Sequence, residues 1–249
     1  MGADSDADRV EAPDDAPPGP EHTWLYAEEA QLAAPLRTTA SSRVTYTSVG
    51  GSPTRPFASN VATPGAMIEL GGEVGILPRV AIAASGVGAA GGAETSLGAV
   101  AGIRVALLPD AWTATRAVAS AGYLRELSGG NGAWGRLALT QDIGSRLRLA
   151  AAVHGEHVFL AGRDGLDVMA VLGANVEVAR HFRAGVEYVG QDLEESLDDE
   201  AEGGVRHFLG PSAALALLDG RLSLTGGPAF GLSASSPRVL GRLAIAWNF

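Results

Sequence analysis

The chain has 249 residues, no cysteine and a formal net charge of −10 at pH 7. These values exclude disulfide bonds and thiolate chemistry, and they argue against nucleic-acid partners, because no basic surface is available to neutralise phosphates. The sequence has no apolar run of about 18 residues or more, so a β-barrel is the only structure with which this chain could span a bilayer.

Residues 1–41 form the predicted N-terminal part. Its first 22 residues are acidic and rich in proline, a composition that is typical of a disordered tail. The following segment, WLYAEEAQLAAPL (24–36), has some helical spacing but is interrupted by Pro35. We expect it to be a short arm, which lies either outside the barrel described below or inside it as a plug.

Residues 42–249 alternate between apolar and polar or small residues in a series of short segments. The pattern predicts twelve strands, with short turns and longer loops in alternation. The predicted strands are 43–49, 66–76, 79–85, 95–107, 112–127, 133–143, 145–159, 166–178, 181–190, 205–218, 221–233 and 237–249. An even number of strands places both ends of this part on the same side, and the Asp-Gly pair at 219–220 is a strong hairpin signal.

Each predicted strand has one continuously apolar face and one face that mixes small residues with arginine and glutamate. On 145–159, for example, Leu147, Leu149 and Val153 oppose Arg148 and His154. A soluble β-sandwich would show the same alternation with its apolar face inward. The long strands with ionisable residues near their centres instead favour a polar lumen, lined by Glu69, Glu73, Arg104, Arg136, Arg148, Glu156, Arg183, Glu187, Arg206 and Arg242. We expect these charges to pair when they are buried.

The last strand keeps its alternation to the final residue, with Leu243, Ile245, Trp247 and Phe249 on one face. This segment resembles the C-terminal signal strand of bacterial outer-membrane β-barrels. The resemblance implies that these residues are read by the barrel assembly machinery, that the apolar face contacts outer-membrane lipid and lipopolysaccharide, and that the chain is located in the outer membrane. The first residues show neither a basic region nor an apolar core of a signal peptide, so this location predicts a mature or leader-trimmed chain.

Together these features predict an all-β fold, an antiparallel up-and-down transmembrane β-barrel of about twelve strands. Its expected function is a narrow channel for small solutes or ions through the Arg/Glu-lined lumen. The many small inward residues favour a water-filled passage. A structural or interaction barrel plugged by residues 24–36 and a soluble sandwich remain as alternatives.

Another alternative is a barrel enzyme that acts on membrane lipids. His154 and Glu156 share one strand face two residues apart, and such a pair could act as a general base with its orienting carboxylate. The sequence identifies no serine nucleophile, and His157 points to the opposite face. A polar pair in the lumen is therefore the favoured interpretation.

Two further motifs concern metals and cofactors. The loop after residue 190 carries Asp192, Glu194, Glu195, Asp198, Asp199 and Glu200, and clustered carboxylates could bind Ca²⁺ or bridge divalent ions to lipopolysaccharide. Its spacing is not that of an EF-hand, so a solvated acidic loop is expected and no metal site is predicted. The G-x-G-x-x-G match at 86–91 is followed by strand-like alternation instead of a helix, so we predict no nucleotide cofactor.

Overall fold

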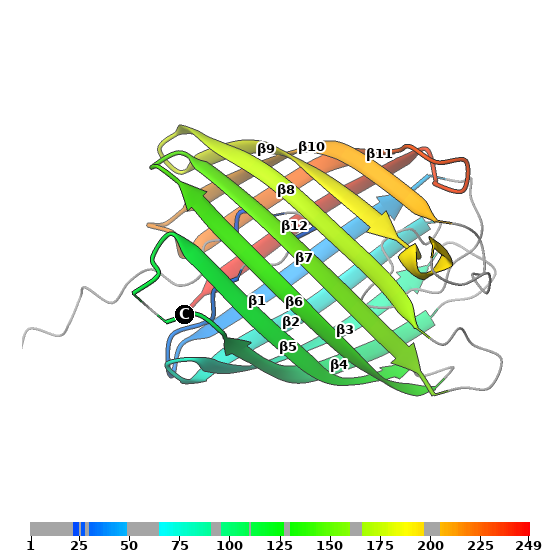
Figure 1. The fold of residues 1–249 in the computed structure, drawn as a ribbon, viewed down its shortest axis with the longest axis horizontal. Coiled ribbons are helices and arrows are strands. Elements are labelled where there is room, and N and C mark those ends of the chain that lie inside the picture. Colours follow the sequence, from blue (N-terminus) through cyan, green and yellow to red (C-terminus); the bar gives the residue numbers. More distant parts are fainter. Residues whose placement is uncertain are drawn as a thin grey trace, which may run out of the picture.

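Twelve antiparallel strands form a closed barrel in which β1 pairs with β12 (Figure 1). The computed structural model describes residues 22–24, 26–27, 30–48, 65–90, 96–109, 111–126, 130–159, 166–196 and 205–249. Most of the predicted acidic tail lies outside these residues. Closure of the sheet confirms the predicted barrel and excludes the alternative of a two-sheet sandwich, because every strand is paired on both sides.

Each predicted strand is present, with ends that differ by a few residues. The strands are β1 (Thr38–Thr47), β2 (Gly65–Leu77), β3 (Val80–Ala90), β4 (Ser96–Ala106), β5 (Thr115–Glu126), β6 (Asn131–Ile143), β7 (Leu147–Val158), β8 (Asp167–Ala179), β9 (Phe182–Gln191), β10 (Arg206–Leu217), β11 (Leu222–Gly231) and β12 (Val239–Asn248). A short 3₁₀ helix, η1 (Leu193–Ser196), follows β9. No helix in the described part of the chain is long and apolar enough to cross a membrane.

The first strand differs most from its prediction, because β1 begins at Thr38 instead of residue 43. Residues 38–42 (TTASS) have no apolar alternation, so their sequence gives no strand signal. They become a strand because both neighbours offer backbone partners: Thr39 pairs with Asn248 of β12 and with Glu73 of β2. Tertiary pairing therefore overrides the weak local preference of this segment.

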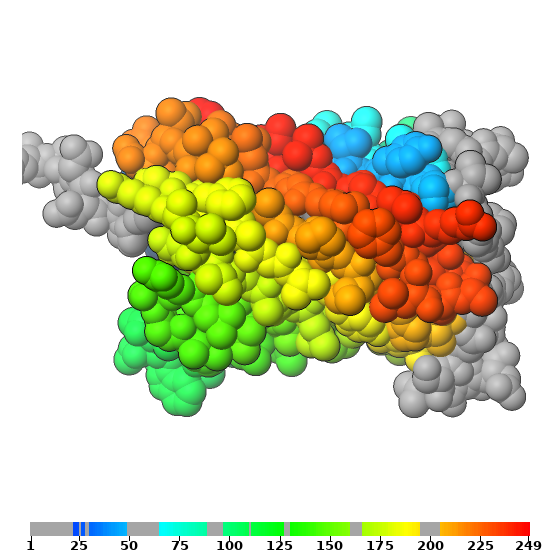
Figure 2. Space-filling model, turned by 90° about the horizontal axis from the view of Figure 1, so that it is seen from above, coloured from blue at the N-terminus to red at the C-terminus, as the bar shows by residue number. Residues whose placement is uncertain are grey.

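The alternation of the strands separates an apolar outer face from a polar lumen. On β7, Leu149 and Val153 are exposed, whereas Arg148, His154 and Glu156 are buried. A ring of exposed leucine, isoleucine, valine and aromatic side chains covers the outside of the barrel. Figure 2 shows the strands as oblique bands around this wall. Such an outer face is suited to hydrocarbon and not to water.

The two ends of the barrel differ. At one end, which we call the short-turn end, brief connections such as 78–79, 144–146 and 180–181 join the strands, and the C-terminus lies at this end (Figure 1). Longer connections, such as 48–64 and 192–205, lie at the other end, the long-loop end. In outer-membrane barrels the short turns face the periplasm.

Candidate functional site: the lumen and its N-terminal arm

Most described residues of the segment before β1 lie inside the barrel, whereas Leu36 and Arg37 are exposed. We call its described residues, 22–24, 26–27 and 30–37, the arm. The arm is joined to the wall where Pro35 forms a parallel bridge with Gly75, and Leu36 donates its backbone N–H to the Gly75 carbonyl at 2.8 Å. From there the chain turns directly into β1. The described residues of this segment, which has interrupted helical spacing in the sequence, are therefore not helical and are held by the lumen wall.

Five described residues of the arm are buried, namely Thr23, Trp24, Ala27, Ala30 and Ala33, and the last four stand three positions apart. None of the described arm residues lies in a helix, and bends occur at Tyr26, Ala27 and Ala30. Backbone groups in such a segment need partners outside it. The wall supplies them at the same spacing: Ala27 donates its N–H to Glu187 (3.1 Å), Ala30 to Thr140 (3.4 Å) and Ala33 to Glu73 (2.6 Å).

Two buried carboxylates carry most of this recognition. Glu187 on β9 accepts the N–H groups of both Tyr26 (2.8 Å) and Ala27 through Oε2. Glu73 on β2 accepts from Ala33 through Oε1, while its Oε2 forms an ion pair with Arg104 on β4. Hydrogen bonds to a charged acceptor are stronger than neutral ones, at about 1.5–3 kcal/mol each. Glu73 and Glu187 thus attach the arm at two separate points.

The wall also donates hydrogen bonds to the arm near its N-terminal end. Thr225 on β11 donates its hydroxyl to the His22 carbonyl at 3.1 Å, and Asn175 on β8 donates to the Thr23 carbonyl at 3.4 Å. Arg148 on β7 reaches the Thr23 hydroxyl at 3.4 Å. Both the donors and the acceptors of the arm backbone are therefore recognised by side chains of the wall.

Glycine provides the space for the arm at two positions. A Cβ atom on Gly173 of β8 would lie 2.6 Å from Cζ3 of Trp24, and one on Gly75 would overlap the backbone oxygens of Ala33 and Ala34. Beside these positions the arm packs into the main apolar clusters of the interior. Trp24 and Ala27 join Met169, Val171 and Phe208 among others, and Ala30 packs with Val118, Ala138 and Ala152. The small inward residues, which suggested an open passage, therefore accommodate the arm along part of the lumen.

Tyr26 places an aromatic ring of the arm beside a lumenal cation. The Arg242 guanidinium lies 4.6 Å from the ring centroid, a cation–π arrangement, and its Nε donates to the Thr45 hydroxyl at 2.9 Å. The phenol oxygen is buried and has no hydrogen-bond partner among the described residues. Burial raises the pKa of Tyr26 to about 12, against the lowering effect of Arg242. The arm is thus docked with a neutral phenol.

A cavity of about 120 Å³ remains between the arm and the wall of β1 to β7. Its charged lining includes the pairs Arg43–Glu69, at 3.1 Å, and Arg104–Glu73. Arg136, His154, Trp134 and Trp24 complete one side. A cavity of this size has space for several water molecules and enough polar groups to hold them. The lumen is therefore polar and partly open beside the arm.

His154 lies in this lining, with both of its ring nitrogens engaged. Arg136 donates its Nε–H to Nδ1 at 3.2 Å, so the ring proton belongs on Nε2, which lies 3.2 Å from Oε2 of Glu156. The ring also stacks on Trp134, with 6.0 Å between centroids. A general base needs a ring nitrogen directed at a nucleophile. The arrangement around His154 is instead that of a fixed polar cluster, and His157 lies on the other side of the strand.

The remaining predicted lumen residues lie near the two ends. Arg148 pairs with Asp142 at 2.6 Å near the short turns, where Arg183 reaches Glu177 at 3.3 Å. Arg206, which is fully buried, lies 3.1 Å from Asp192 at the long-loop end. Charge pairing is thus extensive, but aspartates at strand ends take part as well as the expected lumenal glutamates.

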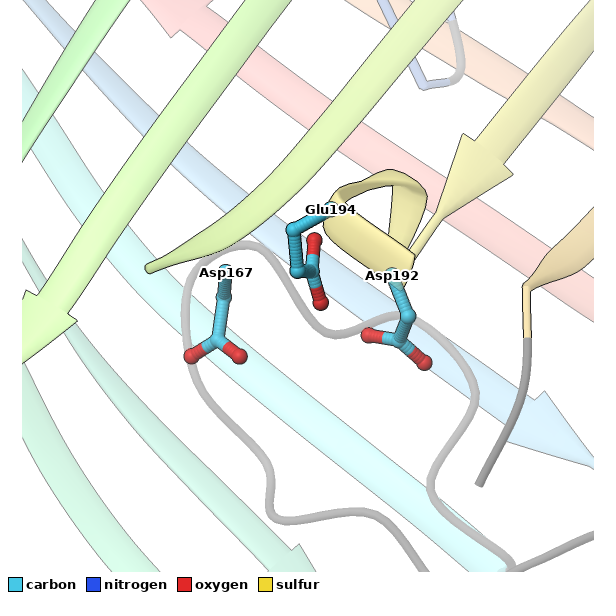
Figure 3. Close-up of side chains that lie close together, drawn as sticks. All are labelled: Asp167, Asp192 and Glu194. Carbon is cyan, nitrogen blue, oxygen red and sulfur yellow. The ribbon is translucent and has the colours of Figure 1, made fainter. Parts of the chain in front are cut away.

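Three carboxylates gather at the long-loop end, as Figure 3 shows: Asp167 at the start of β8, Asp192 after β9 and Glu194 in η1. Their oxygen atoms lie within 4.8 Å of one another. Glu194 also accepts the Val168 N–H at 2.7 Å. Hard cations favour such oxygens, although the positive charge of Arg206 beside Asp192 offsets part of the attraction. Asp198, Asp199 and Glu200 lie outside the described residues, and the side chain of Glu195 is not described.

The residues of the C-terminal signal strand face away from the lumen. Leu243, Ile245 and Phe249 are exposed on the outer face, and the ring of Trp247 lies 6.2 Å from that of Phe249. The strand that carries them closes the barrel by pairing with β1. These residues are therefore accessible on the outside of the wall, and their part in assembly stays a prediction.

No protein-family profile and no curated protein sequence matches the chain. Solved structures do. The COG4313 outer membrane channel from Pseudomonas putida F1 is similar with a TM-score of 0.62 and 7% identity, over 89% of this chain and 98% of that one. The Ralstonia pickettii toluene transporter TbuX is similar with a TM-score of 0.50 and 12% identity, over 86% and 89%. The chain therefore has the fold of bacterial outer-membrane β-barrels, as its last strand predicts.

Several functional residues were not expected from the sequence. Thr140 and Thr225 each contribute one uncharged hydroxyl, whereas the lumen prediction rests on arginine and glutamate. Asp142 and Asp167 lie at strand ends, where the alternation is weakest. The period-three spacing of Trp24, Ala27, Ala30 and Ala33 is visible in the sequence and is the signal that could have identified the arm. It was obscured because the same segment also contains helix-like spacing.

Proposed function

We propose that this protein is a narrow outer-membrane channel for small solutes or ions, in which the arm is a displaceable plug. The observation that carries the proposal is the way in which the arm is held. It is bound to the wall through hydrogen bonds with a few side chains and through packing of Trp24, Ala27 and Ala30, and a polar cavity lies beside it. A plug that is held by separable contacts can leave without unfolding the barrel.

The charges of the lumen support passage of polar solutes. Glu69, Arg43, Arg104 and Arg136 line the cavity, and they lie on rigid strands of the wall. Rings of fixed charges of both signs tune ion selectivity when water fills the space between them. With the arm displaced, Glu187 and Arg242 would join this lining, which already includes Glu73.

The outer face and the fold support the location. The exposed apolar belt requires a hydrocarbon environment, and similar folds occur in an outer membrane channel and in a toluene transporter. Lipid and lipopolysaccharide are therefore the expected surroundings, and the barrel assembly machinery the expected partner of the last strand. The lipid-enzyme alternative is less well supported, because Arg136 and Glu156 engage both nitrogens of His154.

The test is single-channel conductance of the refolded full-length protein in planar bilayers. Glu187→Ala removes the acceptor of two arm N–H groups, and we expect the fraction of time spent open to rise at least tenfold. Glu177→Gln is the matched control, because it removes a carboxylate at the short-turn end that pairs with Arg183 and not with the arm. Glu177→Gln should conduct like the wild-type protein.

A second variant tests whether Glu187→Ala acts by releasing the arm or by disturbing the barrel as a whole. Gly173→Ala crowds the ring of Trp24 without changing any charge, and it should open the channel in the same direction. Absence of conductance in both variants, with an arm that proteases can reach, would refute the channel and favour a structural or interaction barrel.

A further inference from the structure

The wall of the lumen recognises the arm through its backbone. The N–H groups of Ala27, Ala30 and Ala33 point to Glu187, Thr140 and Glu73, and the carbonyls of His22 and Thr23 accept from Thr225 and Asn175. Every peptide has these groups, whatever its side chains. Contacts of this kind fix the conformation and direction of a chain more than they fix its sequence.

We propose that the lumen is a binding track for an extended peptide, filled in cis by the arm and open in trans to short peptides. This inference rests on the displaceable arm of the proposed function, and it names the class of ligand that takes its place. The track runs from Thr225 and Asn175, past Glu187 and Thr140, to Glu73. These acceptors and donors come from strands spread around the barrel, so only a closed wall assembles them.

The spacing of the acceptors sets the conformation of the ligand. The acceptors meet the N–H groups of residues 26, 27, 30 and 33, none of which lies in a helix, so they select a chain whose N–H groups are not bonded internally. A helix would satisfy its N–H groups internally and could not donate them to the wall. The track therefore selects extended peptides and rejects helical ones.

The packing sets which side chains fit. Ala27, Ala30 and Ala33 are buried against the wall, so a ligand needs small residues at every third position. Gly173 leaves space for one indole ring at the Trp24 position. The expected ligand is thus a short extended peptide, with an aromatic residue near its N-terminal end and small residues at intervals of three.

The experiment supplies the arm as a separate peptide. A fluorescent peptide with the sequence of residues 23–35, blocked at both ends, is titrated against full-length protein in detergent, and its anisotropy is recorded. The protein variant is Ala27→Pro with Ala33→Pro, which removes two of the three arm N–H groups that meet carboxylates, one at each carboxylate, and leaves the wall intact. The control peptide is N-methylated at the nitrogens equivalent to Ala27, Ala30 and Ala33, so that it lacks the same donors.

The native peptide should bind the double variant at least tenfold more tightly than it binds the wild-type protein, whose own arm competes. It should also bind at least tenfold more tightly than the N-methylated peptide. Cleavage by a glutamate-specific protease after Glu28 or Glu29 reports whether the arm is released in the variant. Equal binding of both peptides, no binding to a variant with a released arm, or an arm that stays protected would each overturn the inference.

The same variants separate this inference from the proposed channel. Peptide binding without conductance in the double variant would remove the channel and leave the track in place. Conductance without peptide binding would refute the peptide track and leave the channel in place.

Discussion

Gly173 of β8 and Trp24 of the arm are in direct contact, and the contact depends on the absence of a side chain at 173. An added Cβ would lie 2.6 Å from Cζ3 and 2.9 Å from Cε3 of the indole ring, which is closer than such atoms approach one another. A Cβ atom at position 173 would therefore prevent Trp24 from packing against the wall in its present position. This relationship provides a way to move the arm without touching a charge.

Gly173→Ala should release the arm while the barrel stays folded. We expect a loss of about 1–3 kcal/mol of docking free energy from overpacking, and faster cleavage after Glu28 or Glu29 by a glutamate-specific protease. Gly241→Ala is the control, because a Cβ there meets no atom within 4 Å. Equal cleavage of the two variants would show that Trp24 does not hold the arm.

Glu73→Ala should destabilise the barrel as well as the arm. The substitution leaves the buried guanidinium of Arg104 without this carboxylate, a loss of about 3–5 kcal/mol. The double variant Glu73→Ala/Arg104→Ala should recover part of that loss, since it removes the uncompensated charge. Urea unfolding of the protein in lipid vesicles measures both values, and additive effects in the double variant would contradict the coupling.

Alkaline pH should release the arm through Tyr26. The pKa of the docked phenol is raised from 10.0 to about 12, so docking favours the neutral form. The corresponding stabilisation is fully present below pH 10.0 and is lost as the pH rises through about 12. Protease accessibility of the arm should therefore increase across this window. Tyr26→Phe cannot ionise, and its arm should stay protected at the same pH.

Ion selectivity should respond to Glu69. In a background with the arm released by Gly173→Ala, Glu69→Gln removes one negative charge beside Arg43 in the cavity. A change of about 1 kcal/mol in the lumen corresponds to an increase of about fivefold in the anion-to-cation permeability ratio. Reversal potentials in a salt gradient measure the ratio, and Glu177→Gln provides the comparison. An unchanged reversal potential would place Glu69 outside the conducting path.

Calcium should bind the three carboxylates at the long-loop end only weakly, with a dissociation constant above about 1 mM. The reason is that Arg206 lies 3.1 Å from Asp192 and offsets its charge. Arg206→Gln should strengthen binding in calorimetric titrations, and Asp167→Asn added to that variant should reverse the gain. Tight binding by the wild-type protein would show that Arg206 does not control the group.

The sequence predicts the barrel well because strand alternation is a local property. Leu149, Val153, Arg148 and His154 could be assigned to their faces from their positions alone. Residues 38–42 could not, since their strand conformation comes from partners on β2 and β12. Strands of the wall can thus be predicted where the sequence alternates, but not where only pairing with neighbouring strands produces them.

The site was harder to predict because it depends on what fills the barrel. Ten charged residues were placed on the lumen side, yet nothing local indicates that Glu73 and Glu187 bind backbone N–H groups. Asp142 pairs with Arg148 across the β6–β7 hairpin, and Asp167 meets Asp192 and Glu194 at the end of the β8–β9 pair. Such contacts follow from strand register and from the arm inside the barrel, neither of which a residue-by-residue pattern contains.

The arm continues directly into β1 through Arg37, without an intervening linker. A ligand tethered in this way has an effective concentration that is set by geometry and not by the amount of protein. Its release is a unimolecular equilibrium, so dilution cannot empty the barrel. Any free molecule that binds in the same space must compete with the arm, whose local concentration is in the millimolar range. Such a molecule binds only when its own concentration or affinity is high enough to displace the arm.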